Sequence, residues 1–321
     1  MTATARPAGY DACNEYTRII VDEALARGIE VVIHDAEIGE LSLTHHGRTQ
    51  TVIQSLSELT SAIAFRRCDD KAMTRRVLTD AGLSVPAGRI ATDDEDDEAF
   101  LAEHAPIVVK PCRGEGGAGI SVGVADTDAL RSAIESARAT CAQVLLEAMA
   151  PGDDLRVLVI DGAVVAASVR RPPVVTGDGS RTVRALVEAR NEHRARELGG
   201  AMVTPLDDIT AACVQAAGHD LDDVLPEGVR LEVRRTANLH TGGTIEDLTE
   251  RLHPTLAEAA VRGAAAVGLP VAGIDLMVPS PEGPEHVFIE VNEQPGLANH
   301  EPQPTAQRYL DLLFPGTSRR G

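Results

Sequence analysis

The chain has 321 residues and a formal net charge of −19, with 43% hydrophobic, 25% charged and 2% aromatic residues. This acidic balance argues against nucleic acid or an anionic membrane as a partner, because the overall field repels polyanions. No apolar run reaches the roughly 18 residues of a membrane helix and no signal-peptide core stands at the N-terminus, so we expect a cytoplasmic protein without a membrane partner.

The first part of the chain alternates helical and strand patterns, and residues 1–66 are expected to form an N-terminal α/β subdomain. The expected elements are a helix over 14–27, a strand over 29–33, and a hairpin with strands at 41–44 and 49–53. Asn14 begins the helical spacing and Gly28 ends it as a C-cap.

Residues 67–148 are expected to form a central subdomain around a glycine-rich loop. The expected elements are a helix from Asp69 or Asp70 to Ala81, strands at 107–110, 120–124 and 144–147, the loop at 113–119, and a helix over 126–139. Because a strand follows the glycines, the loop is not a dinucleotide fingerprint, and because Lys110 precedes them, it is not a Walker A loop. Such a hairpin can fold over phosphates and offer them backbone N–H groups. The alternative is a flexible surface turn.

Residues 149–321 are expected to form a C-terminal subdomain built on an antiparallel sheet. The expected elements are hairpin strands at 155–160 and 163–169, an irregular stretch with two short helices over 172–228, a strand at 229–234, a helix over 254–267, and strands at 273–277 and 288–292. Asp161-Gly162 is a typical two-residue hairpin turn. The overall fold class is therefore mixed α/β, or α+β.

The last two strands carry oxygen-bearing side chains where apolar residues are usual. Glu290 and Asn292 are two positions apart and should face one side, with Ile289 and Val291 in the core, while Asp275 lies on the other strand. Carboxylate and amide oxygens on one sheet face suit Mg²⁺. The alternative is a sheet edge with solvated acids.

Residues 65–305 resemble the ATP-grasp ligases. Lys71 and Lys110 match the two phosphate-binding lysines of that family, and the segment 147–154 is similar to its adenine hinge. The resemblance implies an ATP site and a metal site for two Mg²⁺ ions, with Mn²⁺ as the alternative. The implied ATP residues are Lys71, Lys110, Gly114, Gly116, Gly117, Gly119, Glu147, Ala150 and Asp154, and the implied metal ligands are Asp275, Glu290 and Asn292.

Three further segments are similar to particular branches of that family. Those at 170–179 and 234–244 resemble cyanophycin synthetase and the glutathione-synthetase half of bifunctional glutathione enzymes, and 292–304 resembles N-acetylglutaminylglutamine synthetase. Two positions depart from the family pattern. Ala148 replaces a basic residue after the hinge glutamate, and Gly273 stands where D-alanine ligases carry an arginine. We therefore expect Arg235 or Arg170 to neutralise charge.

The resemblance implies ATP-dependent amide formation through an acyl phosphate, with Arg235, Arg170 and Asn238 as the catalytic residues. The implied substrates are amino acids or short peptides, joined as in N-acetylglutaminylglutamine-type dipeptide synthesis or as by glutathione or cyanophycin synthetases. An ATP-grasp small-molecule kinase and a non-catalytic ATP-binding module are the other classes. The alternative for the catalytic arginines is that they form solvated ion pairs at the surface. A homo-oligomer is expected only from the resemblance to the family.

Overall fold

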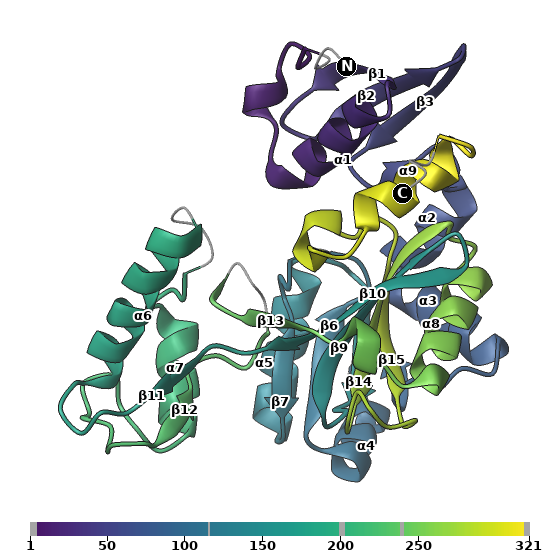
Figure 1. The fold of residues 1–321 in the computed structure, drawn as a ribbon. Coiled ribbons are helices and arrows are strands. Elements are labelled where there is room, and N and C mark those ends of the chain that lie inside the picture. The colour runs from purple at the N-terminus through teal and green to yellow at the C-terminus, as the bar shows by residue number, and fades with distance from the viewer. Residues whose placement is uncertain (1–4, 115, 199–202, 238–240, 318–321) are drawn as a thin grey trace. The chain divides into compact units, whose positions relative to one another are not determined.

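The computed structural model of the chain describes residues 5–114, 116–198, 203–237 and 241–317 (Figure 1). The chain divides into two compact units, which are described separately. Unit 1 comprises Met1–Ala167 with Asp247–Gly321, and unit 2 comprises Ser168–Glu246. This division leaves the boundaries expected for three subdomains, at 1–66, 67–148 and 149–321, as a prediction.

An antiparallel sheet and one helix form the N-terminal part of unit 1, as the sequence predicts. The elements are the 3₁₀ turn η1 (Tyr10–Ala12), α1 (Glu15–Ala26), β1 (Glu30–Asp35), β2 (Glu40–His45), β3 (Arg48–Ile53) and β4 (Leu56–Ser57), with the strands in the order β1-β2-β3-β4. The Asn14 side chain caps α1 by accepting a hydrogen bond from Thr17 N. Leu41 and Leu43 alternate with half-buried residues along β2, and they face the core.

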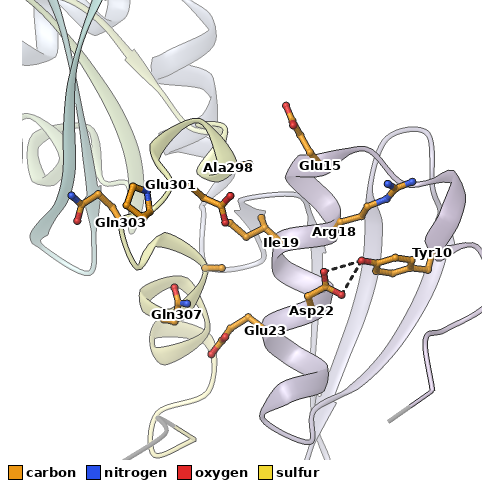
Figure 2. A pocket seen from close by; sticks show the side chains of 12 residues that line it. Tyr10, Glu15, Arg18, Ile19, Asp22, Glu23, Ala298, Glu301, Gln303 and Gln307 are labelled. Atoms are coloured by element: carbon orange, nitrogen blue, oxygen red, sulfur yellow. Dashed lines mark hydrogen bonds between the residues drawn. The ribbon is translucent and has the colours of Figure 1, made fainter. Parts of the chain in front are cut away.

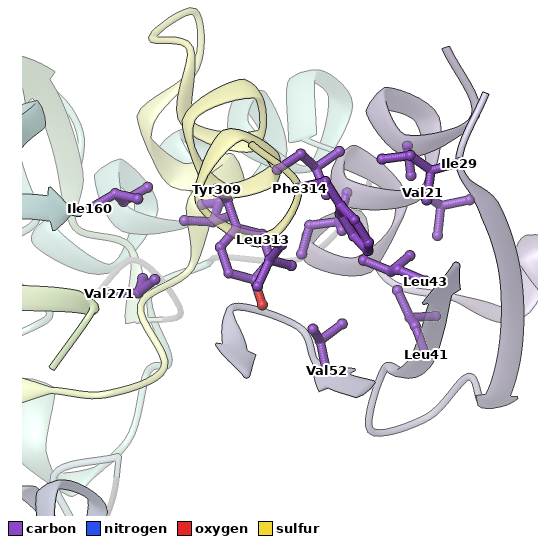
Figure 3. Close-up of a cluster of buried hydrophobic side chains, with 14 of the residues drawn as sticks. Val21, Ile29, Leu41, Leu43, Val52, Ile160, Val271, Tyr309, Leu313 and Phe314 are labelled. Atoms are coloured by element: carbon purple, nitrogen blue, oxygen red, sulfur yellow. The ribbon is translucent and has the colours of Figure 1, made fainter. Parts of the chain in front are cut away.

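The C-terminal helix α9 (Thr305–Leu313) joins this N-terminal part to the rest of unit 1. Figure 3 shows its Tyr309 and Leu313, with Phe314, between the residues of the N-terminal sheet and the pair Ile160 and Val271. All five side chains are buried in one apolar cluster, which also contains Leu41 and Leu43. Burial of this continuous apolar surface stabilises the two ends of the chain against each other.

The glycine-rich loop belongs to a second antiparallel sheet, of order β5-β8-β6-β7. The elements of this region are β5 (Gly88–Ile90), α4 (Glu95–His104), β6 (Ile107–Pro111), β7 (Ser121–Val124), α5 (Thr127–Arg138) and β8 (Val144–Ala148). β6 and β7 pair antiparallel on either side of the loop, so the predicted strand–loop–strand arrangement is confirmed. The acidic run around Asp94 begins α4, with Asp94 as its N-cap.

The third sheet has the order β13-β10-β9-β14-β15, and most of its strands lie in unit 1. Its strands are β9 (Asp153–Ile160), β10 (Ala163–Arg171), β13 (Thr244–Asp247), β14 (Val271–Val278) and β15 (Val287–Asn292). The remaining helices of unit 1 are α2 (Ala62–Asp69), α3 (Lys71–Asp80), α8 (Pro254–Val267) and the 3₁₀ turns η3 (Thr249–Arg251) and η4 (Leu297–His300). The chain passes into unit 2 within β10 and returns within β13.

One expectation for β15 is wrong, because the strand contains an irregularity. Asp275 pairs with Glu290 but Leu276 pairs with Phe288, so Ile289 is an extra residue opposite β14. Phe288 and Val291 are the buried residues, and Ile289 is only half-buried. A bulge of this kind shifts the two-residue alternation that the sequence pattern assumed.

Unit 2 contains α6 (Val183–Leu198), α7 (Asp208–Ala216) and a two-stranded antiparallel sheet of β11 (Val174–Thr176) and β12 (Arg230–Glu232). They enclose a small apolar core of their own that includes Val187, Val214 and Leu231. The expectation of two short helices is wrong for α6, which has 16 residues. No helix among the described residues of either unit is long and apolar enough to cross a membrane.

Candidate active site

The three predicted metal ligands come together on β14 and β15. Asp275 lies directly opposite Glu290, and Asn292 lies opposite Gly273. Asn292 Nδ2 donates a hydrogen bond of 3.2 Å to Asp275 Oδ2. The Asp275 side chain is buried, with 4% of the residue exposed, whereas Glu290 and Asn292 are half-buried. Two carboxylates and one amide are hard oxygen donors, so this group fits Mg²⁺.

Arg156 is a member of this site that the sequence analysis missed. It lies on β9 directly opposite Asp275. Its Nε donates to Asp275 Oδ1 and its Nη2 donates to Oδ2 at 2.9 Å, which makes a bidentate pair. The only local signal is an arginine inside the apolar run of β9, and its partner depends on a strand register that the sequence does not contain.

Gly273 explains how Arg156 reaches this position. A Cβ atom at residue 273 would lie 2.8 Å from Arg156 Nη1 and 3.0 Å from Pro295 Cβ. The guanidinium therefore passes through the space that a side chain at position 273 would occupy. Arg156 thus places a guanidinium beside Asp275. Charge neutralisation by Arg235 or Arg170 during the reaction stays a prediction.

Lys71 connects the metal-ligand strands to the glycine-rich loop. It is the first residue of α3, whose N-terminus is capped by Asp70 through the N–H groups of Ala72 and Met73. Lys71 Nζ lies 3.1 Å from Glu290 Oε1 and donates to the carbonyl of Gly114 at 3.1 Å. A predicted phosphate-binding cation and a predicted metal ligand therefore lie in contact.

Lys110 is held by a buried carboxylate. Its Nζ pairs with Glu147 Oε2, while Arg75 Nη1 pairs with Glu147 Oε1. Lys110 and Glu147 are 4% and 3% exposed. A buried acid that contacts two cations fixes the position of both, so Glu147 orients the Lys110 ammonium.

The backbone of the predicted adenine hinge is partly engaged within unit 1. Ala148 N donates to the carbonyl of Ala87, and Met149 N donates to the carbonyl of Pro106 at 3.3 Å. Contact of Glu147 to Ala150 with an adenine edge, and of Asp154 with a ribose, stays a prediction.

The glycines of the loop fall into two pairs. Gly114, Gly116, Gly117 and Gly119 all have positive φ, at 137°, 66°, 82° and 71°. Added Cβ atoms at Gly114 and Gly119 would meet Thr140 at 2.9 and 3.0 Å, whereas Gly116 and Gly117 have no neighbouring atom within 4 Å. Gly114 and Gly119 therefore pack against the end of α5, whereas the backbone at Gly116 and Gly117 borders open space.

Comparison with known proteins identifies the family. The sequence matches the family described as the RimK-like ATP-grasp domain over residues 68–176 and 230–306, which is more than half of the chain. The chain belongs to this ATP-grasp family.

Curated relatives of this ATP-grasp chain extend the match to nearly its whole length. It is 34% identical to a cyanophycin synthetase of Geminocystis herdmanii over 316 residues, covering 93% of this chain and 36% of the relative. It is 31% identical to the glutathione biosynthesis bifunctional protein of Streptococcus thermophilus over 327 residues, covering 96% and 43%. The chain thus spans less than half the length of either relative.

Solved structures confirm the predicted ATP-grasp fold. A bifunctional glutathione synthetase from Pasteurella multocida is similar with a TM-score of 0.67 and 25% identity, covering 95% of this chain and 44% of that one. A D-alanine–D-alanine ligase from Bacillus anthracis has a TM-score of 0.50 at 16% identity, covering 80% and 70%, and supports the fold alone.

The predicted catalytic residues of the ATP-grasp chain lie in unit 2. Arg170 lies near the end of β10, and the exposed Arg235 follows the buried Arg234. Asn238, like His240, lies outside the described residues. Because the two units are described separately, the part of Arg170 and Arg235 in the site stays a prediction.

Cys112, beside the glycine-rich loop, is a buried thiol, and burial raises its pKa to about 11. At neutral pH the thiol is protonated, which favours a packing role over a reactive one.

A pocket of about 470 Å³ opens elsewhere in unit 1, between α1 and the segment that includes η4 and the start of α9 (Figure 2). Figure 2 shows the Tyr10 hydroxyl bonded to Asp22 on its α1 side, at 2.8 and 2.9 Å from the two carboxylate oxygens. None of the described residues that line it belongs to the predicted ATP or metal site.

Proposed function

We propose that the chain catalyses ATP-dependent formation of an amide bond between a carboxylate and an amine of amino acids or short peptides. The observation that carries this proposal is the cluster of Asp275, Glu290 and Asn292 in contact with Lys71. It places metal ligands next to a cation suited to phosphate. Family membership supports ATP as the nucleotide.

A carboxylate does not condense with an amine in water unless it is activated. In the proposed reaction a substrate carboxylate oxygen attacks the γ-phosphorus of ATP, which releases ADP and forms an acyl phosphate. The amine then attacks the acyl carbon, and phosphate leaves with the oxygen that came from the carboxylate. The protein contributes by positioning the reactants and stabilising the developing charge.

In unit 1, acidic and amide side chains would hold the metal ions and basic residues would contact the phosphates. Asp275, Glu290 and Asn292 would hold Mg²⁺ ions, which supply neutralising charge to the phosphates when bound. Lys71 and Lys110 would contact phosphate oxygens, and the open backbone at Gly116 and Gly117 would let N–H groups approach them. Two ions are proposed because the resemblance to the ATP-grasp ligases implies two.

The substrate class is proposed from the relatives and from the arginines of unit 2. The relatives are named as cyanophycin and glutathione biosynthesis proteins, and both names denote products built from amino acids. Arg235, with Arg170 and Asn238, would bind the acceptor carboxylate and stabilise the tetrahedral oxyanion. An N-acetylglutaminylglutamine-type dipeptide is one product in this class, and glutathione-type or cyanophycin-type ligation are the others.

A panel assay tests the proposal. The protein is incubated with ATP, Mg²⁺ and pairs of free amino acids, N-acetylated amino acids and dipeptides, and free phosphate and product mass are measured. We expect phosphate release that depends on both members of a pair, with a product lighter by one water than their sum. A phosphorylated substrate without free phosphate would indicate a kinase, and nucleotide binding without turnover would indicate a binding module. Either outcome contradicts the proposal.

A further inference from the structure

Hydrogen bonds from arginine side chains hold both ends of the segment of unit 2 that carries Arg235. It runs from the end of β12 to the start of β13. Arg234 holds its first end. This residue is 5% exposed, and its Nη1 donates to Asp207 Oδ1 at 2.7 Å and to Thr210 Oγ1 at 2.8 Å, at the N-terminus of α7. Asp207 also caps α7 through Thr210 N, so Arg234 is fixed to a rigid element.

Two arginines of α6 hold the other end of the segment through its backbone. Arg190 Nη2 donates to the carbonyl of Gly242 at 2.6 Å, and Arg194 Nη2 donates to the carbonyl of Gly243 at 3.0 Å. Gly242 and Gly243 are both buried. Charged donors make the stronger class of hydrogen bond to a buried carbonyl, so these contacts fix the path of the chain.

The residue at position 242 must be glycine for this contact to form. Gly242 has a φ of +92°, and a Cβ atom there would lie 2.0 Å from Thr204 Oγ1 and 3.1 Å from Arg190 Nη1. Thr204 in turn is held by Asn191, whose amide accepts from Thr204 N at 2.8 Å and donates to Thr204 O at 2.7 Å. Arg190 Nη1 donates to Thr204 Oγ1 at 3.2 Å and completes the arrangement.

The arrangement brings two like charges close together on one helix. Arg190 and Arg194 are four residues apart on α6, where like charges repel. Burial and the neighbouring Arg194 lower the pKa of Arg190. A planar guanidinium can reach both Thr204 and the Gly242 carbonyl with separate N–H groups, which an ammonium at the end of a lysine does less well.

We propose that Arg190, Arg194 and Arg234 are positioning residues that hold the segment carrying Arg235, and thereby determine how tightly the protein binds the carboxylate of its amino-acid substrate. The inference rests on the proposed function, in which Arg235 contacts that carboxylate. Position matters here because loss of geometry at a carboxylate clamp weakens binding even when the contacting residue is intact. Nucleotide binding, assigned to residues of unit 1, does not depend on these arginines.

Two measurements on the full chain test this inference. The first is amide hydrogen exchange of the peptide spanning 234–243, and the second is the KM of an amino-acid substrate identified in the panel, compared with the Kd of ADP. In Arg190→Met we expect exchange to be about tenfold faster and KM about tenfold higher, with the Kd of ADP unchanged. Arg194→Met, which removes the bond to the Gly243 carbonyl, should change both quantities in the same direction. It serves as the second variant if the first does not fold.

Two further variants separate positioning from charge and from general destabilisation. Arg184→Met alters an arginine of the same helix that pairs with Asp222 at the surface, and it should change none of the three quantities. Arg190→Lys keeps the charge but loses the planar fork, and it should behave like Arg190→Met. Full rescue by lysine, or exchange in Arg190→Met equal to that of the wild type, would overturn the inference. If no ligation is detected, the proposed function fails, whereas faster exchange still supports the anchoring.

Discussion

Glu147 and Asp275 are buried acids in unit 1, and each is held by an arginine that is distant in the sequence. Arg75 pairs with Glu147, and Arg156 pairs with Asp275. A buried carboxylate without a cation is strongly unfavourable, so the arginine and the acid depend on each other. For Asp275 this dependence links the stability of the fold to the geometry of the predicted metal-ligand group.

Replacing Arg156 should therefore destabilise the protein. Arg156→Met leaves the Asp275 carboxylate buried without its bidentate partner, and we expect a loss of about 3 kcal/mol in the free energy of unfolding. The measurement is urea unfolding at pH 7. Adding Asp275→Asn should recover part of the loss, because the buried negative charge is removed.

The matched control for Arg156 is Arg131, whose side chain is 68% exposed and pairs with Glu98. Arg131→Met should cost at most about 1 kcal/mol, as is usual for surface pairs. Equal losses in the two variants would show that the Arg156 pair has no special role.

Replacing Glu290 should abolish turnover while leaving the fold intact. Glu290→Gln keeps the shape of a half-buried side chain but removes the negative charge of a predicted metal ligand. We expect ADP release to fall by more than about 100-fold. The readout is steady-state ADP release with the substrate pair found in the panel. Glu285→Gln, an exposed acid in the turn between β14 and β15, is the control and should keep its rate. Near-normal ADP release in Glu290→Gln would make the metal assignment wrong.

At the scale of elements, the parts predicted correctly are those whose signals are local. The pairing of β14 with β15 and the strand–loop–strand arrangement at the glycines follow from residues close together in the chain. Arg156 was missed because its contact depends on the register between β9 and β14, and no local pattern fixes that register. The bulge at Ile289 was missed for the same reason, since it shows only when two strands are aligned.

α2 and α9 were not predicted from the sequence, and α6 was expected to be short, each for a different physical reason. α2 has only eight residues, and the main sequence signal for its start is Ser61, whose side chain accepts a hydrogen bond from Ala64 N. α9 begins after Pro304 without a side-chain cap, so it lacks a start signal. α6 carries mostly polar residues, and its role depends on contacts of Arg190 and Arg194 with a distant loop. Tertiary contacts, rather than propensity, decide such elements.

The glycine-rich loop allows a prediction that separates packing from ligand contact. Gly119→Ala would push a Cβ atom against Thr140 and Ala137, at 3.0 and 3.2 Å, whereas Gly116→Ala enters open space. Both positions have positive φ, so both substitutions cost about 1 kcal/mol in backbone strain. We expect Gly119→Ala to lose additional stability, and Gly116→Ala to raise the KM for ATP. Thermal unfolding and ATP-dependent kinetics measure the two effects. Identical behaviour of the two variants would contradict this division of the loop.

At the scale of the whole molecule, the family match and the division into units do not coincide. The RimK-like ATP-grasp match omits residues 177–229, which contain α6 and α7 of unit 2. It includes Lys71, Lys110 and the three predicted metal ligands of unit 1. We therefore expect the nucleotide chemistry to be common to the family, and substrate choice to depend on the part of unit 2 outside the match.

The central claim is that a substrate carboxylate is activated by phosphoryl transfer and then attacked by an amine. The most direct test uses the substrate pair from the panel, with the reacting carboxylate labelled with ¹⁸O, together with ATP and Mg²⁺. The account predicts that the released phosphate carries one ¹⁸O atom from the carboxylate and that the amide product has lost it. Phosphate without ¹⁸O, accompanied by an unchanged labelled carboxylate, would contradict it.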